Sequence, residues 1–392
     1  MGYHETIGNE AASLLEFVET GTTDSAEAPM EVPASAYLDP AYFAAEMEHI
    51  FHKLPILAGL SAEIPNPGDY KAFDLMGKPL LLTRKKTGEV AAMLNVCTHR
   101  GMIVAPEGHG NANRFSCPYH AWTFANDGKL LAVSDAQKFG TICKEDRGLT
   151  RLPCVEAGGI IWVVLTPGAE IDIEKHLGSM LADLDAYDLG KWHYCGSRQI
   201  KGANWKIAYD GYLEGYHFAA AHPETIHPRT MNNIMHFTAQ GPHMRVGFPQ
   251  VGIKESLGAV PRELWGENEN HGYDFVRTIF PNVSIFFAPE ITQVAQLMPG
   301  PTPEENTTNL LFIRREPPKD AEDQAAIEGM MNWLRDVVDK EDYGVGLKVQ
   351  KGLSSGAIKS VVFGKNERGN QYFHKYVDYF VNQDPDGKPP VL

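Results

Sequence analysis

Short runs of apolar and polar residues, separated by turn-forming residues, fill the chain from Gly68 to about residue 166. Alternation of this kind is typical of half-buried β-strands, and the runs are rich in aliphatic and aromatic residues. We therefore predict a small all-β domain in this region. Its expected strands are YKAFDL, KPLLLTR, VAAMLNV, RFSCPYHAWTF, KLLAV and GGIIWVVL.

A helical pattern precedes this domain, over residues 40–51, and follows Asp39, which suits an N-cap. We interpret it as a docking helix. The predicted organisation is an N-terminal segment with this helix over 1–45, the β domain over 46–166 and a second domain over 167–392.

The second domain mixes both patterns. A helix is predicted from Asn204 to about Ala221, where Pro223 stops it. The strand-like runs that follow alternate apolar and polar positions, as in an antiparallel sheet with one face open to solvent, and two helices near 320–350 and 367–381 are expected on its other face. This domain is therefore α+β. Its expected strands are MRVGF, FVRTIF, VSIFFA, TQVAQLM and NLLFIRRE.

Size and charge narrow the function classes. The 392 residues, 43% of them hydrophobic, suffice for two domains with substantial cores. Fifty acidic and 35 basic residues give a net charge of -15, which disfavours nucleic acid and anionic membranes and favours a basic protein partner. No run is long enough for a transmembrane helix and no signal-peptide pattern is present, so a cytoplasmic protein is expected.

Two short motifs offer metal ligands in the order Cys, His, Cys, His: Cys97 and His99, then Cys117 and His120. This order indicates a Rieske [2Fe-2S] cluster, in which two cysteines hold one iron and two histidines hold the other. A structural zinc site is the alternative, although such sites more often pair CxxC knuckles. The glycines at 101, 108 and 110 suit tight turns beside the cluster.

A second constellation lies on the predicted helix, where Glu214 precedes His217 by three residues and His222 follows five residues later. Five residues turn an ideal helix by roughly 140°, so the two imidazoles converge only if the helix distorts or ends between them. Two histidines and one carboxylate on one face of ferrous iron leave positions open for dioxygen and substrate. On spacing alone, the carboxylate could be Asp339, Glu341 or Asp342.

With both constellations in view, the chain resembles the terminal oxygenases of the Rieske non-haem iron family, the α-subunits of aromatic ring-hydroxylating dioxygenases and related demethylases. The resemblance covers about residues 35–385 and rests on CTHRG, CPYHAW, NWK...DGYLEGYH...H and ED...VQKGL. It implies a helix-grip (START-like) catalytic domain and an iron site formed by His217, His222 and Asp342.

The resemblance also implies the roles of nearby residues. Glu214 would bridge the two metal centres, and Glu at this position is familiar from the quaternary-amine branch, whereas many ring-hydroxylating members have Asp. Asp210, which with Tyr209 replaces a Glu-Asn pair of some ring dioxygenases, is assigned with Glu214 to the catalytic residues. In the family, the cluster of one subunit serves the iron of its neighbour, so Glu214 would contact His120 of the partner subunit. We expect a homotrimer, with a small β-subunit as the alternative.

No GxGxxG motif opens a helix, so electrons are expected from a separate NAD(P)H-dependent reductase, with or without a ferredoxin. The predicted function is hydroxylation of an organic substrate, with an aromatic compound favoured. Demethylation or cleavage of a quaternary amine or methoxy compound is the alternative; an electron carrier and a zinc-stabilised binding module represent other classes. The residues predicted to line the substrate pocket are Leu213, Phe218, Ile226, Phe237, Phe286 and Phe287.

Overall fold

The computed structural model describes residues 2–267, 269–383 and 387–392. The chain divides into two compact units. The β unit comprises Phe51–His176 and Tyr187–Trp192, and the α+β unit comprises Met1–Ile50, Leu177–Ala186 and His193–Leu392. None of the described helices combines the length and the apolar character that crossing a membrane requires.

The β unit consists of short antiparallel strands, which confirms the prediction of an all-β domain. One sheet has the order β10-β5-β4-β3-β6, and two three-stranded sheets have the orders β11-β12-β2 and β7-β8-β9. The strands are β2 Ile56–Leu60, β3 Asp69–Leu75, β4 Lys78–Arg84, β5 Val90–Leu94, β6 Gly108–Asn111, β7 Arg114–Ser116, β8 Thr123–Ala125, β9 Leu130–Ala132, β10 Arg151–Leu152, β11 Cys154–Ala157 and β12 Ile160–Val163.

Two of the glycines expected in turns at the cluster lie in a strand instead. Gly108 and Gly110 belong to β6, which pairs with β3. Gly110 faces Tyr70, and a Cβ at this glycine would come within 2.7 Å of the tyrosine ring. Close approach of an aromatic ring therefore explains this glycine.

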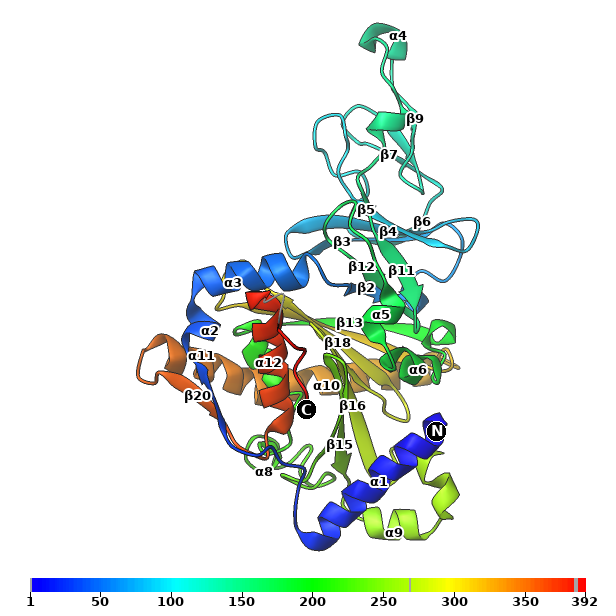
Figure 1. The fold of residues 1–392 in the computed structure, drawn as a ribbon. Coiled ribbons are helices and arrows are strands. Elements are labelled where there is room, and N and C mark those ends of the chain that lie inside the picture. Colours follow the sequence, from blue (N-terminus) through cyan, green and yellow to red (C-terminus); the bar gives the residue numbers. More distant parts are fainter. Residues whose placement is uncertain (1, 268, 384–386) are drawn as a thin grey trace. The chain divides into compact units, whose positions relative to one another are not determined.

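The α+β unit is built on a seven-stranded antiparallel sheet in the order β13-β19-β18-β17-β16-β15-β14 (Figure 1). A separate pair joins β1 to β20. These strands are β1 Met30–Pro33, β13 His193–Gly202, β14 His236–Gln240, β15 His243–Pro249, β16 Tyr273–Ile279, β17 Val283–Phe286, β18 Thr292–Pro299, β19 Asn306–Arg314 and β20 Ser360–Phe363.

Helices pack against this sheet. The longer ones are α1 Tyr3–Thr20, α10 Ala321–Val337, α11 Gly344–Ser354 and α12 Arg368–Asn382. The shorter ones are α2 Ser35–Leu38, α3 Pro40–Glu46, α6 Met180–Asp185, α7 Trp205–Asp210, α8 Phe218–Ala221 and α9 Ile253–Gly258. The predicted N-cap of α3 is confirmed, because the Asp39 carboxylate accepts a hydrogen bond from the Ala41 amide at 2.8 Å.

The expectation that one face of the sheet is open to solvent is wrong. All residues of β15 and β18 are buried, because α1 packs along β15 (Figure 1) and α7 packs against β18 and β19. Helix α10 packs against the edge strand β13. The polar residues in the alternating pattern are therefore buried as well. Arg245 of β15 pairs with Glu10 of α1 and with Asp183 of α6, its Nη1 lying 2.6 Å from the Asp183 carboxylate.

Candidate metal centres and their surroundings

The two loops that carry the Cys-His motifs have the same backbone conformation. In each, the cysteine amide donates a 2.8 Å hydrogen bond to the carbonyl five residues later, and the cysteine carbonyl accepts a 2.9 Å bond from the amide four residues later. The fourth residue has a positive φ in both loops, +81° at Gly101 and +54° at Ala121. The paired residues are Cys97 with Gly101 and Met102, and Cys117 with Ala121 and Trp122.

The side chains of these loops converge. Both cysteines are buried, and the ring centroids of His99 and His120 lie 4.7 Å apart. Burial raises the pKa of the Cys97 thiol, and the neighbouring Cys117 thiol raises it further. His120 Nδ1 is buried without a hydrogen-bond partner, as expected of a nitrogen reserved for a metal. Two thiols and two imidazoles in this arrangement fit a [2Fe-2S] cluster.

Aromatic side chains hold the two imidazoles. His99 stacks on the buried Trp122 with centroids 4.8 Å apart and planes inclined by 8°, and Phe139 contacts His99 edge-on at 5.4 Å. The ring centroids of Tyr119 and His120 lie 3.7 Å apart, and Tyr119 is about half exposed to solvent. The rings therefore fix the orientation of the imidazoles while leaving apolar surface beside them.

The predicted helix from Asn204 to Ala221 is interrupted. Helix α7 begins at its N-cap Asn204, whose side chain accepts a bond from the Lys206 amide, and ends at Asp210. After a turn, the single-turn helix α8 is bracketed by His217 at its N-terminus and His222 at its C-terminus. This ending of the helix lets two histidines five residues apart face the same point.

That point is Asp342. Ligand atoms of His217, His222 and Asp342 all lie within 4.8 Å of one another. Asp342 Oδ1 is 2.9 Å from His222 Nε2 and 3.5 Å from His217 Nε2. The donor set of two imidazoles and one carboxylate suits ferrous iron.

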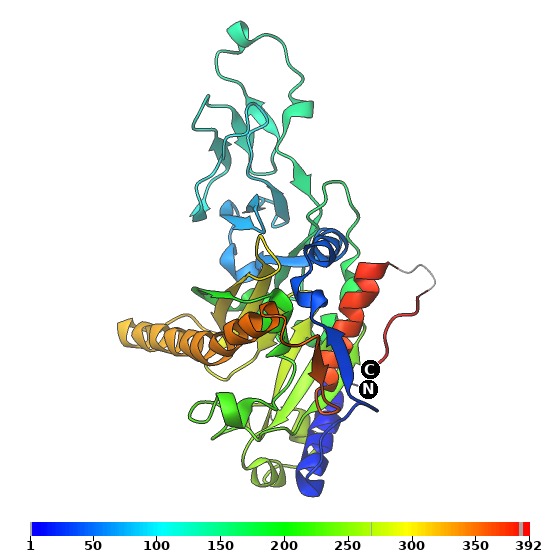
Figure 2. The same cartoon turned by 90° about the vertical axis from the view of Figure 1, so that its left-hand side faces the viewer.

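Asp342 belongs to a π-helical segment, Val338–Tyr343, between α10 and α11. Figure 2 shows the orange ribbon of α10 running directly into it. Of the three acids that spacing left open, Asp339 is exposed, whereas Glu341 and Asp342 reach the histidines. Wide helical turns of this kind often occur at functional sites, where they redirect side chains.

On the side away from Asp342, each histidine ring contacts a glutamate. His217 Nδ1 contacts Glu214, and His222 Nδ1 lies 2.5 Å from Glu341. Glu214 also accepts bonds from backbone amides at the start of α8, including that of His217 at 3.1 Å. Burial lowers the pKa of His217, but Asp342 and Glu214 outweigh it and raise the pKa to about 10. Carboxylates on Nδ1 leave both Nε2 atoms for a cation, as is common for metal-bound histidines.

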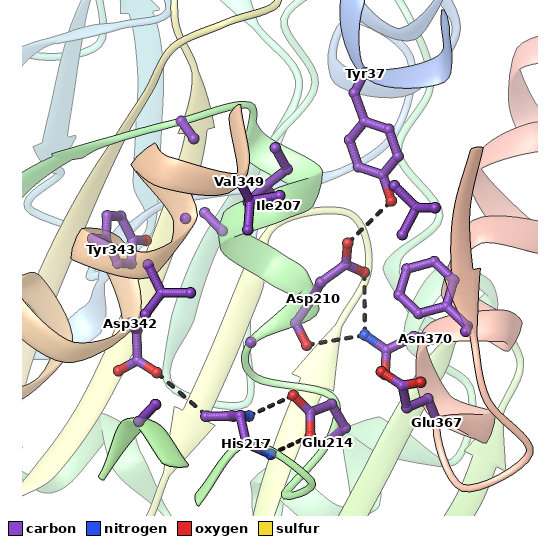
Figure 3. A pocket seen from close by; sticks show the side chains of 18 of the residues that line it. Tyr37, Ile207, Asp210, Glu214, His217, Asp342, Tyr343, Val349, Glu367 and Asn370 are labelled. Atoms are coloured by element: carbon purple, nitrogen blue, oxygen red, sulfur yellow. Dashed lines mark hydrogen bonds and ion pairs between the residues drawn. The ribbon is translucent and has the colours of Figure 1, made fainter. Parts of the chain in front are cut away.

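A cavity of about 220 Å³ lies beside these residues (Figure 3). Its wall includes His217 and five carboxylates, and no lysine or arginine appears among the described lining residues. The carboxylates belong to Asp210, Glu214, Glu341, Asp342 and Glu367.

None of the six residues predicted to line a substrate pocket contributes to this cavity. Leu213, Phe218, Phe237 and Phe287 are buried core residues, and Ile226 and Phe286 are partly buried. The residues that do line it include Tyr37, Ile207, Val349 and Asn370 from segments far apart in the sequence. Sequence periodicity identifies buried positions but does not show which of them border a cavity.

Two family models match the chain. Residues 189–383 match that of the ring hydroxylating alpha subunit (catalytic domain), and residues 55–152 match that of the Rieske [2Fe-2S] domain.

Relatives with several substrates are similar to the chain. The large subunit of 2-halobenzoate 1,2-dioxygenase from Burkholderia cepacia is 33% identical over 196 residues, 47% of this chain and 42% of that protein. The glycine betaine monooxygenase oxygenase subunit of Pseudomonas aeruginosa is 31% identical, over 54% of this chain and 50% of that protein. The carnitine monooxygenase oxygenase subunit of Escherichia coli K12 is 27% identical, over 88% and 91%. The chain thus spans about half of the first two relatives and most of the third.

Solved structures share the fold. The quaternary ammonium Rieske monooxygenase CntA in complex with an inhibitor gives a TM-score of 0.78 at 22% identity, covering 95% of this chain and 98% of that one. Naphthalene 1,2-dioxygenase from Rhodococcus sp. bound to indole gives 0.73 at 20% identity, covering 96% and 99%.

Proposed function

We propose that this chain, which belongs to the α-subunit family of Rieske non-haem iron oxygenases, is a terminal oxygenase acting on a quaternary ammonium compound. The observation that carries the substrate proposal is the extent of the similarity to carnitine monooxygenase oxygenase subunits, which covers 88% of this chain. The aromatic dioxygenase subunits match over less than half of it. Glu214, familiar at this position from the quaternary-amine branch, supports the same assignment.

The charge of the cavity is consistent with this proposal. Its described wall carries five carboxylates and no basic side chain, so it suits a positively charged group. A permanently positive ammonium group is attracted by both the carboxylates and the faces of aromatic rings such as Phe363.

Each metal-binding residue then has a role. Cys97, His99, Cys117 and His120 would hold the [2Fe-2S] cluster, whereas His217, His222 and Asp342 would hold a single ferrous ion. When bound, these groups supply one-electron transfer and dioxygen activation. Glu214 and Glu341 keep the two iron-site imidazoles in one tautomer, because their carboxylates accept the Nδ1 protons.

Electron delivery would occur between copies of the chain, as the family resemblance implies. The β unit exposes Met102, Tyr119 and Phe139 near its histidines, and the α+β unit exposes Val345, Leu347 and Val349 on α11. We propose that these apolar surfaces meet between subunits of a homotrimer, bringing His120 of the partner subunit to Glu214. A reductase, with or without a ferredoxin, would supply the electrons.

Oxygen consumption by the reconstituted system tests the substrate class. Carnitine and glycine betaine should each stimulate dioxygen uptake with product formed, whereas 2-halobenzoate, anthranilate and naphthalene should not. Uptake only with the aromatic compounds would reverse the assignment. An aromatic substrate remains the second candidate, because the halobenzoate and anthranilate dioxygenase subunits have 33% identity where they match.

The variant His217→Ala separates an oxygenase from an electron carrier. It should abolish turnover while the visible spectrum of the cluster survives, since His217 lies outside the β unit. Metal analysis of the active protein should find iron beyond that of the cluster. Turnover without such iron would support the electron-carrier alternative instead.

A further inference from the structure

Asp210 is held at the wall of the cavity by three side chains, two of which, Tyr37 and Asn370, are drawn in Figure 3. The Tyr37 hydroxyl donates to its Oδ2 at 3.2 Å, and the Asn370 amide nitrogen donates to its Oδ1 at 3.2 Å and to its backbone carbonyl at 3.0 Å. His374 Nε2 lies 3.0 Å from Oδ1 and 3.3 Å from Oδ2. Burial and the nearby Asp210 raise the pKa of Tyr37, so its phenol remains a neutral donor.

His374 is buried behind this carboxylate. It lies on α12, only 6% exposed, and its ring stacks on Phe363, which lines the cavity, with centroids 5.0 Å apart. His374 Nε2 also lies 3.0 Å from the Tyr37 hydroxyl. Since a carboxylate can only accept hydrogen bonds, the contacts with both oxygens of Asp210 favour the tautomer with its proton on Nε2, while the Tyr37 hydroxyl donates to Oδ2. No motif in the sequence identifies His374, since it lies 164 positions from Asp210.

Charged side chains lie close to His374. Glu46 of α3 lies near it and contacts Lys206 of α7, and both side chains are buried. Two carboxylates, Asp210 and Glu46, thus face one lysine.

The cavity brings water to the Asp210 carboxylate. Its volume of about 220 Å³ holds several water molecules. The groups that face this water on the wall near Asp210 are Glu214 and Glu367, both of which can accept hydrogen bonds.

We propose that His374 and Asp210 form a proton-holding pair that supplies the water of the cavity beside the iron site. The inference rests on the proposed function, because hydroxylation consumes protons: RH + O₂ + 2e⁻ + 2H⁺ gives ROH + H₂O. A proton passes from His374 Nε2 to Asp210 and from Asp210 to cavity water, and between turnovers the pair regains a proton from that water by the same path through Asp210. Tyr37 and Asn370 act as positioning residues that fix the carboxylate.

Three variants separate proton supply from a structural role. His374→Gln keeps a hydrogen-bond donor near the Nε2 position but cannot exchange a proton. His374→Ala removes the donor as well as the exchangeable proton. Proton supply predicts that both variants lower kcat at least tenfold with KM changed less than twofold, and that added imidazole restores part of the activity of His374→Ala. Asp210→Asn should match His374→Gln. A structural role predicts instead that His374→Gln keeps the activity of the wild type and that imidazole does not change the activity of His374→Ala.

His236→Gln is the matched control, because His236 is a partly buried histidine beside a carboxylate, 3.7 Å from Asp24. It should keep kcat within twofold of the wild type. All proteins should retain cluster absorption and iron content. The deuterium solvent isotope effect on kcat should rise in His374→Gln and Asp210→Asn but not in His236→Gln. An unchanged effect in His374→Gln, together with kcat within threefold of the wild type, overturns the proposal.

A measurement without turnover keeps the pair testable if no substrate is found. Protonated His374 opposite ionised Asp210 predicts that His374→Gln lowers the thermal unfolding midpoint more at pH 6 than at pH 8, since histidine loses its charge over this range. In the Asp210→Asn background this difference should disappear. Equal losses of the unfolding midpoint at both pH values contradict the pair, even if the oxygenase function is confirmed. If no tested substrate is oxidised, this measurement still tests the pair, because it does not depend on turnover.

Discussion

At the scale of residues, the candidate iron site is a set of imidazoles whose two nitrogens face different carboxylates. Asp342 lies at the Nε2 side of both rings, while Glu214 and Glu341 occupy the Nδ1 sides. Each glutamate thereby sets which nitrogen is free for a metal.

Glu341→Gln tests this role. The substitution keeps the side-chain volume but weakens the acceptor for His222 Nδ1, so we expect iron affinity to fall by about 10- to 100-fold. Iron titration of the apoprotein measures the change. Asp339→Asn, an exposed acid of the same helical segment, should leave affinity unchanged. Equal affinity in both variants would remove Glu341 from the site.

Asp274 of β16 makes stability depend on pH. Burial raises its pKa to about 6 from 3.8. The folded protein therefore binds more protons than the unfolded chain between about pH 4 and 6, so this group's contribution to the unfolding free energy falls as pH rises through that window.

Asp274→Asn should remove this pH dependence. Asparagine can still accept the 2.9 Å hydrogen bond from the Gln250 amide, and the variant should be more stable at pH 7 by up to about 3 kcal/mol. Urea unfolding of both proteins at pH 5 and pH 7 measures the effect. The gain should be smaller at pH 5; an identical gain at both pH values would contradict the assignment.

The residues predicted from sequence differ in how far local information defines them. Cys97, His99, Cys117 and His120 form local motifs with a distinctive order, and the structure brings the two loops together. His374 and Tyr37 belong to no motif, and only tertiary packing places them on Asp210. Spacing could not separate Asp342 from Glu341, because the π-helical segment changes which side chains share a face.

At the scale of elements, α1 explains why alternating apolar and polar residues in the sheet strands do not mark a solvent-exposed face. Its buried residues Ile7, Ala11 and Leu14 pack on β16 residues Tyr273 and Phe275. The helix also brings Glu10 to Arg245, with Arg245 Nε 2.7 Å from the carboxylate. Polar residues alternating with apolar ones predicted a solvated face, but an amphipathic helix with a matching charge covers it.

Glu10→Ala should be strongly destabilising. It leaves the buried guanidinium of Arg245 with Asp183 as its remaining partner, and removing one member of a buried ion pair costs about 3–5 kcal/mol. Chemical denaturation measures the loss. Glu16→Ala, an exposed position on the same helix, should change the unfolding free energy by less than about 0.5 kcal/mol. Similar effects for both variants would show that the ion pair contributes little.

Fold class and most strands follow from the sequence, because periodicity reflects burial directly. Helix boundaries follow less well. The segment after Asn204 has helical composition throughout, yet it turns between Asp210 and His217, where Glu214 accepts backbone hydrogen bonds that a continuous helix would satisfy internally. Side-chain capping of this kind competes with the helix and is not visible in hydrophobic periodicity.

At the scale of the whole molecule, the proposed electron transfer between copies of the chain predicts how mixed assemblies should behave. His217→Ala should lack a functional iron site, and Cys97→Ser should lack a functional cluster, so each protein alone should be inactive. Co-expressed in equal amounts, they should regain up to roughly a quarter of wild-type activity, because an intact cluster then adjoins an intact iron site on a neighbouring chain.

Sedimentation should find three chains in the mixed and wild-type assemblies. Mixed assemblies that remain inactive, with full metal occupancy of the intact sites, would place electron transfer within one chain.

The wide helical turns at Val338–Tyr343 also set which side chains of this helix face the iron site and which face the cavity. A single deletion there, for example of exposed Lys340, would remove the extra residue that the wide turns hold, so the side chains within the segment would change faces. Asp342 could then no longer point at the imidazoles while Val345 and Val349 border the cavity. The chain can therefore lengthen or shorten its loops far more safely than it can lose one residue from this helix.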